Sequence, residues 1–216
     1  MNKIIAVSIF ICSLTTTAFA QTDARAKAIL GQVSKNYRSY ATSKADFTYS
    51  VDDPDSKDKQ TQTGTIYIKS NTDKYKLVFQ NQEVISDGKN QWTYLKADKE
   101  VQLSEVDKKA NSINPADIFT LYENGFKYVY TGDSKVNGKL CYTIDLSPTD
   151  INKPYFKVRL SIDKTAKRIA KAVVFNKDGS RYNYVITSFT PNVKLSDAIF
   201  TFDPKQHPGV ELVDLR

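Results

Sequence analysis

Apolar residues recur along this chain with two different spacings, one helical and one extended. In the segment 23–40, Ile29, Val33 and Tyr37 recur every four residues, which predicts an amphipathic helix. From residue 46 onward the spacing becomes two, and that period places alternate side chains on opposite faces of a strand. We therefore expect one N-terminal helix followed by a long series of β-strands.

The strand-like segments each have an apolar side and a polar side. The segment 155–163 shows the alternation most clearly, and such alternation is typical of antiparallel sheets with one face in the core. The side chains expected to share the apolar face are Phe156, Val158, Leu160 and Ile162 in 155–163, Phe47, Tyr49 and Val51 in 46–51, Ile66 and Ile68 in 64–69, and Tyr75, Leu77 and Phe79 in 74–79.

Short turn signals separate many of these segments. The pairs Asp87-Gly88, Asn137-Gly138 and Asp178-Gly179 tolerate positive φ and favour tight hairpins. About eleven strand-like segments follow one another, joined mostly by short links. The sequence therefore predicts a meander of antiparallel strands.

A second, short helix is expected to interrupt the strands. Asn114 can cap it, Pro115 suits its first turn and Gly125 can end it. Two modest helices cannot cover the apolar face of so many strands, so we expect an incomplete, unclosed antiparallel β-barrel whose helices form a lid over an apolar cavity. The apolar side chains expected on the lid are Ile29, Val33 and Tyr37 from the first helix, and Ile118, Leu121 and Tyr122 from the second.

The first twenty residues have the pattern of a secretory signal peptide. Lys3 precedes an apolar run over 4–14, and Ala18-Phe19-Ala20 forms a small-x-small cleavage site. We expect cleavage after Ala20, which leaves 21–216 as a single exported domain. The cleavage removes one lysine and no acid, so the formal net charge falls from +7 to +6.

The composition narrows the possible chemistry. From residue 21 onward the chain has one cysteine, Cys141, and one histidine, His207, too few for a histidine-based triad, a multi-histidine zinc site or a Cys–His nucleophile pair. We therefore expect no catalytic residues, no metal and no cofactor. We also expect no nucleic-acid partner, since the lysines alternate with apolar residues as on a solvated face. A secreted hydrolase with two carboxylates remains an alternative, because the chain has 24 acidic residues.

Several segments resemble one known family. The segment 86–94, SDGKNQWTY, is similar to the S-D-G-K-x-x-W-x-Y signature of LolA, the periplasmic outer-membrane lipoprotein carriers. The segments 45–51 (ADFTYSV), 64–69 (GTIYIK) and 200–215 (FTFDPKQHPGVELVDL) resemble other family segments in the same order. The resemblance covers nearly the whole chain from residue 21. It implies an unclosed barrel with a helical lid, in agreement with the layout expected from the spacing.

The resemblance also implies a function. LolA proteins shield the acyl chains of lipoproteins, which they take from an inner-membrane lipoprotein-releasing ABC transporter and carry to the outer membrane, where an acceptor can take them. We therefore expect a periplasmic, non-enzymatic monomer that binds acylated lipoproteins. A carrier of another amphiphile, such as a membrane lipid or a polyketide-like product, remains open. The expected cavity walls are Phe47, Tyr49, Ile66, Ile68, Leu77, Phe79, Trp92, Tyr94, Val158 and Leu160.

Two points remain open at this stage. Apolar residues spaced by two are most often simply core, so a filled interior is the alternative to a cavity. The chain also departs from the family at the end of the 64–69 segment, where many members have Lys-Arg-Pro and this chain has Lys69, Ser70 and Asn71. In those relatives the arginine is thought to bond to the lid. We therefore expect a looser lid here, or a different fastening.

Overall fold

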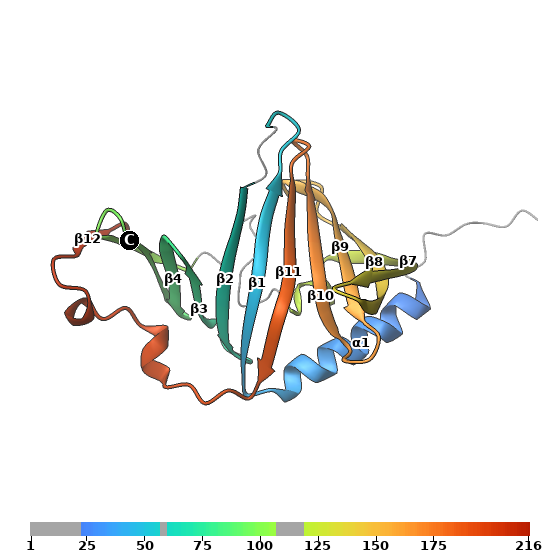
Figure 1. Ribbon diagram of the computed structural model, residues 1–216, viewed down its shortest axis with the longest axis horizontal. Helices are drawn as coiled ribbons and strands as arrows, with labels where there is room; N and C mark the ends of the chain where they lie inside the picture. Colours follow the sequence, from blue (N-terminus) through green and yellow to red (C-terminus); the bar gives the residue numbers. More distant parts are fainter. Residues whose placement is uncertain (1–22, 57–59, 107–118) are drawn as a thin grey trace, which may run out of the picture.

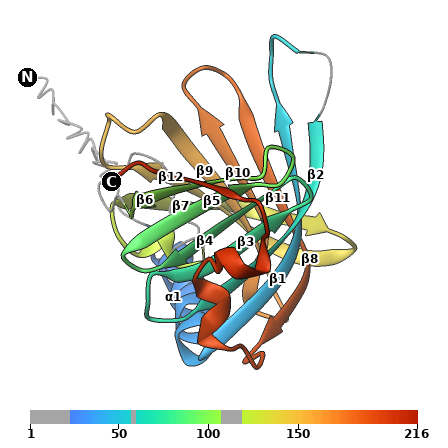
Figure 2. The same ribbon diagram turned by 90° about the vertical axis from the view of Figure 1, so that its left-hand side faces the viewer.

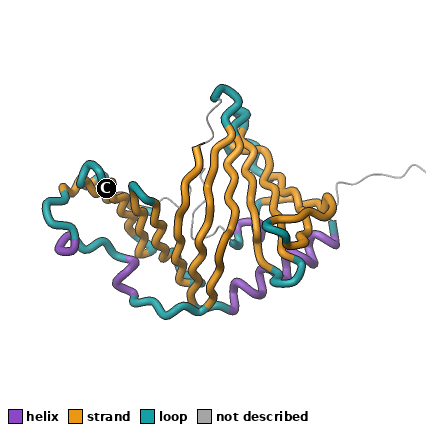
Figure 3. The backbone as a smooth tube through the Cα atoms, viewed as in Figure 1, coloured by secondary structure: helices purple, strands orange, loops and turns teal. Residues whose placement is uncertain are grey.

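The computed structural model describes residues 23–56, 60–106 and 119–216. Strands dominate these residues, with one α-helix and three short 3-10 helices (Figures 1 and 3). The helical elements are α1 (Ala24–Ser39), η2 (Leu121–Glu123), η3 (Asp197–Phe200) and η4 (Pro204–Gln206). The strands are β1 (Thr42–Asp52), β2 (Gln60–Lys69), β3 (Lys74–Phe79), β4 (Gln82–Asp87), β5 (Asn90–Leu95), β6 (Glu100–Glu105), β7 (Phe126–Val136), β8 (Lys139–Pro148), β9 (Tyr155–Asp163), β10 (Arg168–Asn176), β11 (Arg181–Pro191) and β12 (Glu211–Asp214).

All twelve strands belong to one curved sheet, in the order β12-β6-β5-β4-β3-β2-β1-β11-β10-β9-β8-β7 (Figure 2). Its two outermost strands in the described chain, β12 and β7, do not pair with each other, so the expected unclosed barrel is confirmed. The pair β12–β6 is parallel, whereas the other pairs are antiparallel. Strand β12 has four residues and little alternation of its own, and it covers the backbone edge of β6.

Helix α1 forms where the four-residue spacing predicts it, and both of its ends are tied to the sheet. At its start, the Asp23 carboxylate accepts hydrogen bonds from the N–H groups of Arg25 and Ala26 and from that of Tyr130 on β7. At its end, the hydroxyl of Tyr37 accepts a hydrogen bond from the Ile169 N–H, 3.1 Å away. The helix therefore closes one end of the sheet beside β7, β9 and β10, as Figure 1 shows.

In the described residues 119–125, the structure differs from the predicted second helix. Residues 119–120 form a turn, and η2 extends only from Leu121 to Glu123 before Gly125, which has a φ of 76°. Ile118, Asn114 and Pro115 lie outside the described residues. The bend at Thr120, with a φ of −129°, is incompatible with an α-helix that continues to Gly125.

The predicted hairpin turns are confirmed. Gly88, Gly138 and Gly179 have φ values of 96°, 77° and 88°, which an ordinary side chain rarely adopts. At the first of these turns the Asp87 carboxylate accepts hydrogen bonds from the N–H groups of Lys89 and Asn90, at 2.8 and 2.7 Å. The aspartate thus fixes the turn with its own side chain.

Two separate apolar clusters form on opposite faces of the sheet. The larger, which we call the inner cluster, gathers the buried side of α1 and the inward side chains of β1–β3 and β7–β11. The smaller, which we call the outer cluster, consists of Ile85, Val101 and Phe202, with Trp92, Tyr94 and Val210 packed on them. Figure 2 shows the C-terminal segment running across β3–β6 on this outer side.

The expectation for Phe156 is wrong. The β9–β10 pairing shifts register between Phe175 and Asn176, so Tyr155 takes the buried position, and Phe156 remains 52% exposed. Its ring lies 6.2 Å from the Phe175 ring on the outer face. A bulge of this kind moves a side chain to the other face without changing the apparent alternation in the sequence.

Candidate functional site

The concave face of the sheet encloses an apolar cavity of about 300 Å³. Its walls come from β1–β4, from β9–β11 and from the segment that precedes and enters η2. The described residues that line it are Phe47, Tyr49, Ile66, Leu77, Phe79, Gln82, Phe119, Leu121, Val158, Ala172, Val174, Tyr184 and Ile186. The volume is about twice that of an engineered cavity of roughly 150 Å³ that stays dry and binds benzene.

Strand register brings these walls together. Ile66 pairs with Ala45 on one side and with Leu77 on the other, and Leu77 pairs in turn with Val84. Residues directly opposite one another in a sheet share a face, so one row of apolar side chains crosses four strands. A similar row runs from Leu160 to Ala172 on the other half of the sheet.

Gly64 lets two aromatic rings meet in the cavity wall. A Cβ at this position would lie 2.6 Å from the Phe47 ring and 3.0 Å from the Phe79 ring. These two rings pack edge to face, with their centroids 5.8 Å apart. A bare backbone at Gly64 therefore allows two large rings to form the wall without filling the interior.

The cavity has few polar groups to direct a ligand. Among its described lining residues there is no Asp or Glu, and Gln82 supplies the one amide. Burial raises the pKa of Tyr184, and burial together with the neighbouring Tyr182 raises that of Tyr49, so both phenols stay neutral at physiological pH. Such a surface suits an apolar chain of any detailed shape, whereas hydrolysis by two carboxylates requires acids that converge on the substrate.

Side chains from α1 and from residues 119–123 close one side of the cavity. The Phe119 ring stacks on the Tyr37 ring at 4.6 Å, and the Ser34 hydroxyl donates a hydrogen bond to the Tyr122 hydroxyl at 3.2 Å. Arg38 forms a two-point ion pair with Glu123, its Nε lying 3.1 Å from Oε1. This pair lowers the pKa of the Glu123 carboxyl and raises that of Arg38. The last turn of α1 is thus fastened to η2.

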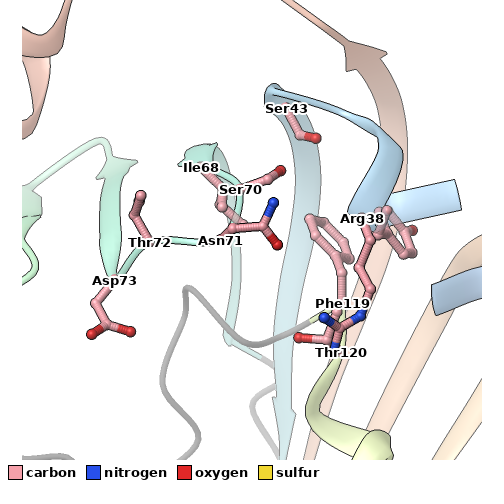
Figure 4. A pocket seen from close by; sticks show the side chains of 10 residues that line it. Arg38, Ser43, Ile68, Ser70, Asn71, Thr72, Asp73, Phe119 and Thr120 are labelled. Carbon is pink, nitrogen blue, oxygen red and sulfur yellow. The ribbon is translucent and has the colours of Figure 1, made fainter. Parts of the chain in front are cut away.

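A second, polar pocket of about 300 Å³ lies beside this fastening (Figure 4). Phe119 lines both this pocket and the apolar cavity, so one ring separates them. Ser70, the residue that the sequence analysis places at the family's arginine position, and Arg38 both line it, and the Ser70 N–H donates to the Ala41 carbonyl. The arginine of this pocket therefore comes from α1 and not from the end of β2.

Comparison with known proteins identifies the family. Residues 38–203 match the family described as "Outer membrane lipoprotein carrier protein LolA", which is well over half of the chain. The chain belongs to the LolA family. It is 27% identical over 176 residues to the outer-membrane lipoprotein carrier protein of Pasteurella multocida (strain Pm70), and the match covers 80% of each chain. Membership of this family supports a role in lipoprotein sorting or carriage.

Solved structures share the fold at low identity. An uncharacterized conserved protein of Thermus thermophilus superposes with a TM-score of 0.59 and 13% identity, over 88% of this chain and 99% of that one. The structure of MucB has a TM-score of 0.51 and 16% identity, over 84% of this chain and 64% of the other. At such identities the likeness shows the fold alone.

Six of the ten residues predicted as cavity walls in this LolA-family chain line the apolar cavity: Phe47, Tyr49, Ile66, Leu77, Phe79 and Val158. Leu160 is fully buried in the inner cluster behind them. Ile68 lines the polar pocket instead. Of the lid residues, Leu121 lines the cavity, whereas Ile29, Val33, Tyr37 and Tyr122 are buried in the inner cluster.

Trp92 and Tyr94 do not line the cavity. Trp92 pairs with Ile85 and Tyr94 with Glu83, whereas the inward row passes through Val84. Both rings belong to the outer cluster, and the Tyr94 ring lies 5.5 Å from Phe202 and 4.6 Å from His207. The alternation in β5 is as predicted, but the face was assigned wrongly because β5 has apolar partners on its outer side too.

The remaining wall residues, which the sequence analysis missed, are Gln82, Phe119, Ala172, Val174, Tyr184 and Ile186. Alternation in 182–186 offers a signal for Tyr184 and Ile186. The run Ala172, Val173, Val174 has none, because Val173 on the other face is also apolar. Within the described residues, no group of three His, Cys, Asp or Glu side chains could hold a metal ion. In the same part of the chain, no helix is long and apolar enough to cross a membrane.

Proposed function

We propose that this protein is a periplasmic, non-enzymatic carrier that shields the acyl chains of lipoproteins in its apolar cavity on their way from the inner to the outer membrane. The observation that supports this most is the cavity itself, a preformed space bounded by aliphatic and aromatic side chains within a LolA-family fold. A filled core would leave no such space.

The energetics of the task fit this surface. Burial of an acyl chain gains about 0.8 kcal/mol per methylene, so a chain of about fifteen methylenes gains on the order of 12 kcal/mol. The walls can supply much of this through contact alone. They have few fixed hydrogen-bonding groups, so they impose no exact head-group geometry, and release requires only that a more apolar environment be offered.

The proposal includes export and named partners. A signal peptide over residues 1–20, with cleavage after Ala20, would deliver the domain 21–216 to the periplasm as a monomer. The inner-membrane lipoprotein-releasing ABC transporter would load it, and an outer-membrane acceptor would take the cargo. The related protein of Pasteurella multocida bears the name of an outer-membrane lipoprotein carrier, which supports this assignment.

Photocrosslinking in cells tests the cargo directly. A benzophenone amino acid replaces Phe79, which lines the cavity, and in a matched control it replaces Tyr67, whose cross-strand partner Lys76 lies on the opposite face from Leu77. We expect Phe79 to capture lipid-modified proteins, and Tyr67 to capture none. Free lipids or pigments at Phe79 would favour the carrier of another amphiphile. An absence of any cargo from a folded, crosslinkable protein would contradict the proposal.

A cavity-filling pair of variants provides a second readout of the same proposal. Ala172 lines the cavity, and its neighbour Lys171 on β10 lies on the other face of the sheet. Ala172→Phe should abolish binding of an acylated peptide while the fold stays cooperative, and Lys171→Phe should leave binding unchanged. Equal binding by both variants would show that the cavity is not the cargo site.

A further inference from the structure

The polar pocket and the apolar cavity are neighbours on the concave face of the sheet. Ile66 lines the cavity, and Ile68, the next residue of β2 on the same face, lines the polar pocket. Side chains two residues apart on a strand share a face and are about 7 Å apart. The Phe119 ring lines both spaces. A molecule whose acyl chain occupies the cavity can therefore place its other end in the polar pocket.

The wall of the polar pocket includes a buried hydroxyl that is free to bond. Ser43 pairs with Ile68 across β1 and β2, so its side chain is on the concave face (Figure 4). The residue is only 4% exposed, and within the described chain no hydrogen bond reaches its hydroxyl. Buried polar groups in native proteins nearly always have a partner. A buried hydroxyl in the wall of an open pocket is therefore a ready contact for a ligand.

The turn between β2 and β3 adds further polar groups at the rim of the pocket. Ser70 and Asn71 line it, and in the part of the chain that the structure describes neither side chain makes a hydrogen bond. The turn itself is held in place, because the Thr72 hydroxyl donates to the Lys69 carbonyl at 2.7 Å. Asn71 has a φ of 56°, a conformation that asparagine tolerates. The rim therefore presents a hydroxyl and an amide that need little reordering to meet a ligand.

The charges around the polar pocket are balanced. Arg38 and Asp73 are the charged residues among the described lining, and Glu123 pairs with Arg38. With the lysines that flank the turn and their shared partner included, three cations meet three acids: Arg38, Lys69 and Lys74 against Asp73, Glu123 and Asp197. A phosphate or a carboxylate gains no net attraction here, whereas an uncharged ester, hydroxyl or amide can bond to the hydroxyls and the amide of the wall.

From these contacts we infer that the polar pocket binds the uncharged head of an acylated molecule, an ester, hydroxyl or amide group whose chain lies in the apolar cavity. The inference rests on the proposed function for the position of the chain and adds the chemical class of the head. The Ser43 hydroxyl donates to a carbonyl oxygen of the head, and the Asn71 amide donates and accepts at the rim. The volume of about 300 Å³ is at the lower end of the range for small-ligand sites. Two sources offer this chemistry, the acylated end of a lipoprotein and a neutral glycerolipid.

A set of probes with one alkyl chain and different heads tests the inference. Monolauroylglycerol, an uncharged lauroylated peptide, lauryl phosphate and dodecane each displace an apolar fluorescent dye from the purified protein, processed as the cell leaves it. In the double variant Ser43→Ala/Asn71→Gly, the Kd of an uncharged probe should rise about tenfold, because two hydrogen bonds are lost. The Kd values of dodecane and lauryl phosphate should stay within about twofold. A rise for the peptide alone identifies a lipoprotein head, a rise for the glyceride alone identifies a glycerolipid, and a rise for both identifies the shared chemistry.

A matched double variant removes the same groups elsewhere. Ser50 is on β1 with its side chain on the opposite face from Ser43, and Asn137 has a φ of 48° in the β7–β8 turn. Ser50→Ala/Asn137→Gly should leave every Kd within about twofold. Ser43→Ala removes a hydroxyl without a partner, so the urea midpoint should not fall. If the first double variant does not fold, Asn71→Gly alone, at an exposed position, should raise the Kd of the uncharged probe about threefold.

Three results would overturn the inference. They are an unchanged Kd for both uncharged probes, an equal rise for lauryl phosphate or dodecane, and an equal rise in the matched control variant. If dodecane still displaces the dye in any of these cases, the apolar cavity remains a binding site and only the assignment of the polar pocket fails. If neither the dye nor dodecane binds, the proposed function fails, and this inference fails with it.

Discussion

The inner and outer clusters are two apolar surfaces of one sheet, and they are completed in different ways. On the outer face of β3–β6, the chain covers its own apolar residues, because Phe200 and Phe202 from the C-terminal segment are 1% and 6% exposed. On the inner face, the walls meet only in part and leave about 300 Å³ empty. The same kinds of side chain therefore form a filled core in one place and the wall of a cavity in the other.

The difference depends on what lies opposite each surface. The outer cluster is covered by the C-terminal segment of the same chain. The His207 ring of that segment stacks on Phe202, with the ring centroids 4.8 Å apart. Among the described residues, the helical elements beside the inner surface are α1 and η2, which are too short to fill the space under so many strands. Close packing is the rule in protein interiors, so the apolar cavity is the feature of the inner face that our proposed function explains.

The largest expected contrast comes from removing one ring in each region. Phe202→Ala should destabilise the protein by about 3–5 kcal/mol, because it opens a cavity in a filled core. Phe79→Ala enlarges a space that already exists, so it should cost no more than about 2 kcal/mol while weakening acyl-peptide binding by about tenfold. Urea unfolding and peptide titration measure the two effects.

The contrast between the regions would be wrong if Phe79→Ala cost as much stability as Phe202→Ala and left binding unchanged. The inner surface would then be an ordinary core. If Phe202→Ala weakened peptide binding in the folded state as strongly as Phe79→Ala does, the outer cluster would belong to the binding site.

A smaller contrast is expected between the ion pairs that fasten each region. Arg38–Glu123 joins α1 to η2 over the inner side, and Asp197 joins η3 to Lys69 at 2.7 Å and to Lys74 at 3.3 Å on the outer side. Glu123→Gln should speed release of an acylated peptide by less than about fivefold, since the Arg38 side chain is 59% exposed and the pair is therefore partly screened by water. Asp197→Asn should speed amide exchange in the C-terminal segment and leave release unchanged.

The pH dependence of these ion pairs has a definite sign. Hydrogen bonding to Arg38 lowers the pKa of Glu123, and hydrogen bonding to Lys69 and then to Lys74 lowers that of Asp197. Each carboxylate therefore stabilises the folded state fully above its ordinary value, 4.5 or 3.8, and this contribution is lost as the pH falls through the lowered value. Amide exchange of residues 119–126 should quicken in that acid range, and much less so in Glu123→Gln. Equal quickening in the variant would assign the effect to other groups.

The smallest expected effect concerns the departure at Ser70. Ser70→Arg should place a second guanidinium in the polar pocket and slow amide exchange of 119–123 by about threefold or less, because Arg38 already pairs with Glu123 there. Thr72→Arg, at an exposed position of the same pocket, is the matched control. Unchanged exchange in Ser70→Arg, or the same slowing in both variants, would mean that position 70 has no special role in holding the lid.

Periodicity and turn chemistry alone determined much of the architecture. The four-residue spacing of Ile29, Val33 and Tyr37 predicts α1, and the period of two in 74–79 and 155–163 predicts β3 and β9 to the residue. These signals are local, since a helix or strand that must bury one face has to repeat apolar residues at its own period. The motifs in 86–94 and 200–215 indicated the family, and the match over residues 38–203 confirms it.

Only the tertiary structure decided which apolar face is hollow and which is filled. Trp92 and Tyr94 alternate as wall residues should, yet they lie under the C-terminal segment, and a register shift moves Phe156 to the outer face. Alternation fixes which side chains share a face but not which face is inside, because that depends on strand register and on what packs opposite. The sequence therefore determined α1, many of the strands and the family, whereas long-range pairing determined the cavity and its fastening by Arg38.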